Sequence, residues 1–172
     1  MSIQFNLQKS TETLAFNLQK KNVGTINPCQ VTFIQDVSGS FDDEHRNGYT
    51  QAMLNRFVPF ANLFDKNKTM ESFVFSDQAM QLKDITINNY SDYIRKQVIG
   101  CSVYNGMTEY YKAIKLVLNS VNQPKSSGFF GSLFGKKEAV KEKYLHFFLT
   151  DGESQTKHKD LQTINELLGS DG

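Results

Sequence analysis

The sequence contains no tryptophan and only two cysteines and three prolines among its 172 residues. Cys29 and Cys101 are too few for a disulfide framework, which predicts a reduced, cytoplasmic protein. No stretch approaches the roughly 20 apolar residues of a membrane span, and residues 1–6 lack the basic and apolar regions of a signal peptide. The net charge of +1 gives no reason to expect a nucleic acid or an anionic membrane as partner.

The chain has the length of one domain with a sizeable core, for which its 14 phenylalanines supply bulky side chains. Its apolar patterns alternate between those of strands and those of helices. This alternation predicts an α/β fold, a Rossmann-like open and mainly parallel sheet with helices on both faces. The predicted strands are 30–36, 70–76, a short one ending at Leu82, and 144–149; the predicted helices are 43–64, 90–99, one from Thr108 onward, and 158–168. Pro59 is expected to kink or divide its helix.

Two regions differ from this pattern. Apolar residues between Phe5 and Leu18 alternate with polar ones, which favours a short hairpin or extended arm over residues 1–28, with a loosely ordered leader as the alternative. The domain proper then covers 29–172. Within it, residues at about 122–143 form a Gly-, Ser- and Lys-rich insertion, predicted to be flexible. Alternatively, an apolar cluster within it forms an exposed partner-binding segment: Phe129, Phe130, Leu133 and Phe134.

Oxygen-bearing side chains follow predicted strands or precede a predicted helix at three separate places. Asp36-Val37-Ser38-Gly39-Ser40 follows the strand at 30–36, Thr108 begins a helix, and Thr150-Asp151-Gly152 follows the strand at 144–149. Ligands collect at such edges of open α/β sheets. Carboxylates and hydroxyls suit Mg²⁺, Mn²⁺ or Ca²⁺ better than zinc or copper. An alternative is that Asp36 and Ser38 merely cap the next helix, which leaves the other two motifs unexplained.

These motifs resemble the metal-ion-dependent adhesion site of von Willebrand factor A (vWA) domains. That pattern is D-x-S-x-S after the first strand, a Thr in a later loop and an Asp after the fourth strand. The resemblance implies the metal ligands Asp36, Ser38, Ser40, Thr108 and Asp151. It also implies that the metal is contacted by an acidic side chain of a partner protein, so that the domain recognises a partner and is not an enzyme.

Within this family, the chain is most similar to the tellurium-resistance (Ter-type) vWA proteins. The similarity rests on Asp-Val-Ser-Gly-Ser, on residues 57–65 and 72–77, and on Ile87-Asn-Asn-Tyr-Ser-Asp-Tyr-Ile94. It implies a role in a tellurium-resistance or stress-response system, together with other Ter-type proteins. The family's Gly-Gly-Thr-Asn-Tyr loop is replaced by Gly106-Met107-Thr108-Glu109-Tyr110. A complete domain of this type has another strand and helix, so the resemblance also predicts a C-terminal truncation or an edge that something else completes.

Two alternatives to metal-dependent recognition stay open. The first is a Mg²⁺-dependent hydrolase or phosphatase, since an oxygen-ligated Mg²⁺ can position a phosphate ester. The sequence offers no evident general base or nucleophile beyond the ligands, and neither a P-loop nor a G-x-G-x-x-G motif. The second is a scaffold that binds no metal.

Overall fold

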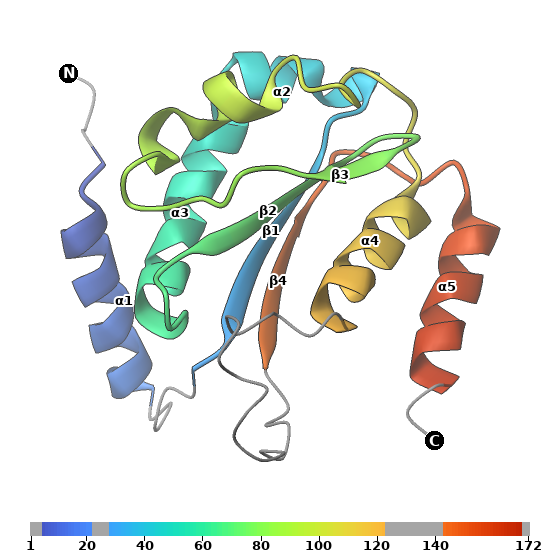
Figure 1. Ribbon diagram of the computed structural model, residues 1–172. Coiled ribbons are helices and arrows are strands. Elements are labelled where there is room, and N and C mark those ends of the chain that lie inside the picture. Colours follow the sequence, from blue (N-terminus) through green and yellow to red (C-terminus); the bar gives the residue numbers. More distant parts are fainter. Residues whose placement is uncertain (1–4, 22–27, 123–142, 170–172) are drawn as a thin grey trace, which may run out of the picture.

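The computed structural model describes residues 5–21, 28–122 and 143–169, which are built around one four-stranded sheet (Figure 1). The strands are β1 (Gln30–Asp36), β2 (Met70–Phe75), β3 (Ala79–Gln81) and β4 (Tyr144–Leu149). Their order is β3-β2-β1-β4. β1 is parallel to β2 and to β4, whereas β3 is antiparallel to β2. The predicted open, mainly parallel sheet is therefore confirmed.

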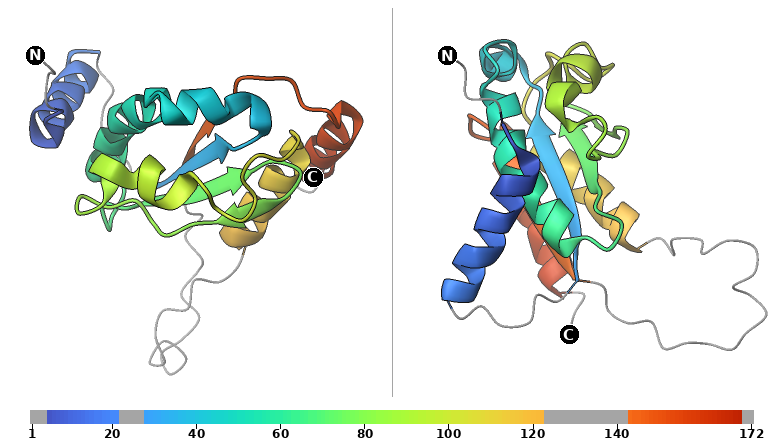
Figure 2. Two further views of the ribbon diagram at one scale, coloured as in Figure 1. Left: turned by 90° about the horizontal axis from the view of Figure 1, so that it is seen from above. Right: turned by 90° about the vertical axis from the view of Figure 1, so that its left-hand side faces the viewer.

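Helices cover both faces of this sheet, as the two further views in Figure 2 show. On one face lies α3 (Tyr49–Phe64), with α1 (Leu7–Lys20) packed against its outer side. On the other face lies α4 (Tyr110–Asn122), which packs on β2 and β3 and is flanked by α5 (Lys157–Gly169). The short helix α2 (Asp42–Arg46) precedes α3. This is the layered α/β arrangement that the sequence predicts.

The central strand β1 is buried on both faces, as its nearly continuous apolar sequence, rich in β-branched and aromatic side chains, predicts. Val31 and Phe33 point into the core shared with α3, where they join Leu54 and Val58. Ile34 points into the second core, which Phe73, Phe75, Ala113 and Val117 form under α4. Alternate residues of one strand thus anchor the two helical layers, and this fixes the position of the strand end that carries Asp36.

The N-terminal residues form the helix α1, so the prediction of a hairpin or extended arm is wrong. Asn6 caps this helix by accepting a hydrogen bond from the Lys9 N–H at 2.9 Å. Leu7, Leu14 and Leu18 also recur at helical spacing, and α1 packs on α3. Phe16, whose alternation with its neighbours suggested a strand, is 64% exposed. Packing against α3 therefore decides between two periodicities that the same residues satisfy.

The helix predicted at 43–64 is divided, but not at Pro59. The break falls at Gly48, whose positive φ of 81° ends α2 and precedes α3. Pro59 lies inside α3 and is buried. The helix predicted at 90–99 consists instead of a 3-10 turn, Tyr90–Asp92, and one π-helical turn, Ile94–Val98.

The edge strand β4 differs from the buried strand that its apolar sequence suggests. His146, which stands among apolar residues in this strand, is exposed, its ring stacks on Tyr144 and its Nδ1 contacts the Thr32 hydroxyl. Most of the predicted insertion, with Phe129, Phe130, Leu133 and Phe134, lies outside the described residues. Within the described ranges, no helix is long and apolar enough to span a membrane.

Candidate functional site

The site begins where β1 and β4 end side by side. Asp36 is the last residue of β1, and the parallel register pairs Gln35 with Leu149. This register places Thr150 next to Asp36, and the Thr150 hydroxyl donates a hydrogen bond of 2.7 Å to Asp36 Oδ2. Residues far apart in sequence therefore meet at the carboxyl end of the sheet, where open α/β folds bind ligands.

One backbone hydrogen bond and two close oxygen contacts then link four of the five predicted ligands. The Ser38 N–H donates to Asp36 Oδ1 at 2.8 Å. The hydroxyl oxygens of Ser38 and Ser40 are 3.3 Å apart. The Ser40 hydroxyl donates to Asp151 Oδ1, also at 3.3 Å. The structure therefore brings together Asp36, Ser38, Ser40 and Asp151, although Asp151 is far from the others in sequence.

Thr108 reaches this edge on the loop that precedes α4. The Asn105 N–H donates to the Val37 carbonyl at 2.7 Å, and the Gly39 N–H donates to the Gly106 carbonyl at 3.0 Å. A Cβ on Gly106 would lie 2.3 Å from Asp77 Oδ1 and 2.9 Å from Ser76 Cβ. Because Ser76 Cβ is fixed to the backbone, this close approach requires glycine. Thr108 itself is 6% exposed. Its carbonyl accepts from the Gln155 N–H at 2.9 Å, which ties Thr108 to the loop after Asp151 through the backbone.

Buried negative charge is the main electrostatic feature of the site. Asp36 is 0% exposed, and in the described ranges no ion pair joins Asp36 or Asp151 to a Lys, Arg or His. Burying a carboxylate is costly unless it is paired or coordinates a metal. A divalent cation would provide the missing countercharge.

The oxygen spacing also fits a divalent cation. Adjacent ligands of an octahedral Mg²⁺ are about 3 Å apart and those of Ca²⁺ roughly 3.4 Å apart, from their usual metal–oxygen distances. The 3.3 Å separations at Ser40 require little movement to satisfy either. Among the residues that the structure places, no three His, Cys, Asp or Glu side chains form a metal-binding group. A metal here therefore depends on hydroxyl ligands as well as carboxylates.

Three of the acidic residues that flank the motifs have partners of their own. Asp42 pairs with Arg46 at 2.7 Å and accepts from the Tyr104 hydroxyl at 2.9 Å, and these two hydrogen bonds lower the pKa of Asp42. Glu109 lies 3.9 Å from the Lys112 ammonium group, and Glu153 lies 2.5 Å from that of Lys157. Asp36 and Asp151, by contrast, can serve the candidate metal site without first breaking an ion pair in the described ranges.

Sequence reasoning missed three residues that hold the site in place. They are Thr150, Tyr110 and His45. Thr150 binds Asp36 directly, and the Tyr110 hydroxyl contacts both Thr150 Oγ1 and the Gly152 carbonyl on either side of Asp151.

The third of these residues, His45, is buried, with Nε2 2.8 Å from the Asp36 carbonyl and Nδ1 2.9 Å from the Thr50 hydroxyl. Because a carbonyl only accepts, Nε2 carries the proton and Nδ1 accepts from Thr50. Burial lowers the pKa of His45, which agrees with this neutral form.

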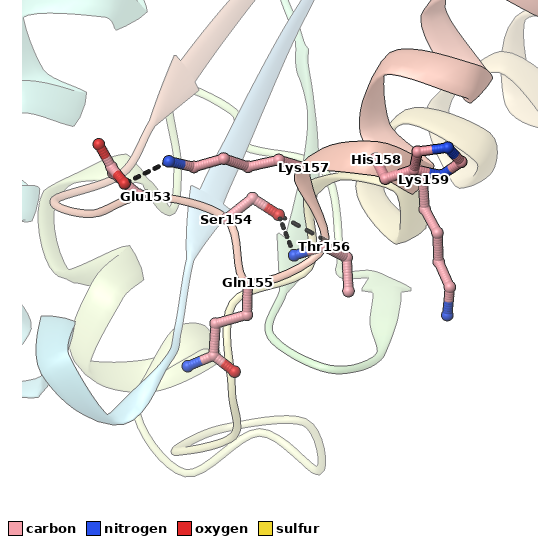
Figure 3. Close-up of a pocket in the computed structure, with 7 residues that line it drawn as sticks. All are labelled: Glu153, Ser154, Gln155, Thr156, Lys157, His158 and Lys159. Atoms are coloured by element: carbon pink, nitrogen blue, oxygen red, sulfur yellow. Dashed lines mark hydrogen bonds and ion pairs between the residues drawn. The ribbon is translucent and has the colours of Figure 1, made fainter.

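An open hollow lies where the loop after Asp151 leads into α5. It is lined by residues 153–159 (Figure 3). In Figure 3 the Lys157 side chain reaches Glu153, whereas the Lys159 side chain extends away from it. The Ser154 hydroxyl accepts from the Thr156 N–H at 3.2 Å and shapes the turn into α5.

The mainly parallel sheet, helices on both faces and carboxyl-end loops of this chain define a vWA domain. The chain belongs to the family described as "vWA found in TerF C terminus", whose model matches residues 28–167. It is also 24% identical over 94 residues to the uncharacterized protein YcbR of Bacillus subtilis (strain 168), and this match covers 55% of the chain and 37% of YcbR. No solved structure matches the chain. The predicted membership among Ter-type vWA proteins is thus confirmed.

Proposed function

We propose that this protein is a divalent-metal-dependent protein-interaction module. The observation that carries the proposal is the fully buried Asp36 carboxylate, which has no cationic partner in the described ranges and lies beside the linked oxygens of Ser38, Ser40 and Asp151. Domains of the vWA family generally mediate contacts between proteins. Metal binding at this edge would make such a contact depend on the cation.

The residues that would hold Mg²⁺, Mn²⁺ or Ca²⁺ are Asp36, Ser38, Ser40, Thr108 and Asp151. A cation bound by two carboxylates and neutral hydroxyls supplies an electrophilic position for an acidic side chain of a partner protein. Asp36 is held by the Ser38 N–H and the Thr150 hydroxyl, so its carboxylate is oriented before a cation binds. Ser40 and Asp151 are exposed, and the partner would therefore approach from their side.

The surroundings of the site favour recognition over hydrolysis. A hydrolase needs a base that can take a proton from water. Both ring nitrogens of His45, the histidine nearest to Asp36 in sequence, are engaged by Thr50 and by the Asp36 carbonyl. The His45 side chain is also only 3% exposed, so solvent water has little access to it.

Family membership supports a place in a Ter-type tellurium-resistance or stress-response system, with other Ter-type proteins as candidate partners. The cysteines do not support direct chemistry on tellurite by this chain. Burial raises the pKa of both the Cys29 and the Cys101 thiol. A raised pKa lowers the fraction of reactive thiolate at neutral pH.

Calorimetric titration of Mg²⁺, Mn²⁺ and Ca²⁺ into the parent protein tests the metal site directly. We expect binding at one site that Asp36→Ala abolishes and Asp151→Ala nearly abolishes. Thr108→Ala should weaken partner binding more than metal binding. Glu12→Gln on α1 removes the same charge far from the site and is the matched control. Metal binding that is unchanged in all three site variants would refute the proposal.

A pull-down from cell extract in Mn²⁺ and in EDTA then tests the functional claim. Capture of a partner in Mn²⁺ alone supports metal-dependent recognition. Equal capture in EDTA would instead identify a metal-free scaffold, whereas phosphatase activity that both Asp36→Ala and Asp151→Ala abolish would identify a hydrolase.

A further inference from the structure

Three lysine side chains surround the ring of one tyrosine between α4 and α5. The ammonium groups of Lys112, Lys115 and Lys159 lie 5.2, 5.8 and 5.3 Å from the centroid of the Tyr111 ring. Each distance is within the range of a cation–π contact. All three ammonium groups therefore lie within one Debye length, about 8 Å in physiological salt, of the same aromatic ring. We call these four residues the lysine–tyrosine patch.

Of the three lysines, Lys112 is the one on which the carboxylates of Glu109 and Asp77 act. Glu109 lies 3.9 Å from the Lys112 ammonium group. In the part of the chain that the structure describes, no ion pair engages Lys115 or Lys159. The neighbouring Asp160 is buried, and its Oδ1 accepts from the Tyr111 N–H at 2.8 Å. Lys115 and Lys159 therefore hold positive charge next to an aromatic ring that no described ion pair offsets.

The position of the patch links it to the candidate metal site. Tyr110, which precedes the patch residue Tyr111 at the start of α4, contacts Thr150 and Gly152 on either side of Asp151. Lys159 belongs both to the patch and to the lining of the hollow that begins at Glu153, just after Asp151 (Figure 3). The patch and the loop after Asp151 are therefore neighbours, joined through Tyr110 and Lys159.

We propose that the lysine–tyrosine patch binds an acidic segment of the same partner that presents a carboxylate at the metal site. This inference rests on the proposed function and deepens it by specifying the charge of the partner around its metal-binding residue. The three ammonium groups come from two helices and lie around an aromatic ring. They do not form the paired donors that hold a single carboxylate or phosphate in a bidentate contact. Such a spread arrangement matches several carboxylates along an extended chain better than one compact anion.

Fluorescence anisotropy with a fluorescein-labelled hexaglutamate peptide tests this proposal. The test variant is Lys115→Gln/Lys159→Gln, which removes the two lysines without a described ion pair. The matched control is Lys9→Gln/Lys20→Gln, which removes two exposed lysines from α1 at the opposite side of the molecule in Figure 1. Both are measured in Mn²⁺ and in EDTA, together with Asp36→Ala, and thermal melts verify that each variant is folded.

We expect the patch variant to bind the peptide about tenfold more weakly than the parent, both in Mn²⁺ and in EDTA, because an exposed charge pair contributes roughly a factor of two to five. The control variant should stay within about twofold of the parent. Asp36→Ala should lose only the increment in affinity that Mn²⁺ provides.

Equal affinity of the patch and control variants would overturn the proposal. So would complete loss of peptide binding in Asp36→Ala, because the peptide would then bind at the metal site alone. Competition by inorganic phosphate at the same charge concentration as glutamate would assign the patch to a compact anion and not to an acidic segment. If the parent takes up no Mn²⁺ while the patch variant still loses peptide, the metal-dependent function fails and the patch stands.

Discussion

The substitution Asp36→Asn separates the two roles of this carboxylate, as a buried charge and as a metal ligand. The present carboxylate lies 2.8 Å from the Ser38 N–H and 2.7 Å from the Thr150 hydroxyl. The new side chain keeps both contacts, because its amide oxygen accepts from the Ser38 N–H and its amide nitrogen donates to the Thr150 hydroxyl. The substitution also removes a charge that is 0% exposed and has no ion pair in the described ranges. Without metal, we therefore expect no loss of stability and a small gain.

With metal, the same substitution should have the opposite effect. A ligand that binds only the folded state stabilises it by about 2.7 kcal/mol at one hundred times its dissociation constant. For a protein of this size, that corresponds to a rise of about 5–10 °C in the melting temperature. The parent should show this rise in Mn²⁺, and Asp36→Asn should not.

Thermal unfolding by circular dichroism, in Mn²⁺ and in EDTA, measures both effects on the same samples. Glu12→Gln is the control, because it removes one charge on α1 and its amide oxygen can still accept the Gln8 hydrogen bond. An equal Mn²⁺-dependent rise in the parent and in Asp36→Asn would place the metal elsewhere. No rise in the parent at a saturating Mn²⁺ concentration would refute the metal site itself.

Two further predictions concern the support of the site. Gly106→Ala should destabilise the protein by about 1–3 kcal/mol, because its Cβ would lie 2.3 Å from Asp77 Oδ1. Gly152→Ala is the control and should be nearly neutral, because its Cβ meets nothing within 4 Å. Equal urea midpoints for the two variants would contradict this prediction. Gln35→Met should stabilise the protein by about 1–3 kcal/mol. The reason is that the Gln35 amide is fully buried and has no hydrogen-bond partner among the described residues. A urea midpoint lower than that of the parent would show that the amide is needed.

Much of the architecture follows from local sequence patterns. The run at 30–36 predicts a strand buried on both faces, and β1 is such a strand, because only a strand covered on both faces can bury consecutive apolar residues. The alternation of strands and helices likewise predicts the parallel sheet. Where two periods fit the same residues, as in α1, the pattern alone is ambiguous, and packing against α3 decides.

The chemical type of the candidate site also follows from the sequence, which supplies two carboxylates and three hydroxyls at predicted element ends. The sequence does not contain the register between β1 and β4, which places Thr150 on Asp36 and Asp151 on Ser40. Nor does it contain the close approach that requires Gly106, or the packing of α4 on α5 that gathers three lysines around Tyr111. Periodicity is a property of neighbours along the chain, whereas these contacts join residues far apart along it. Only the tertiary structure decides them.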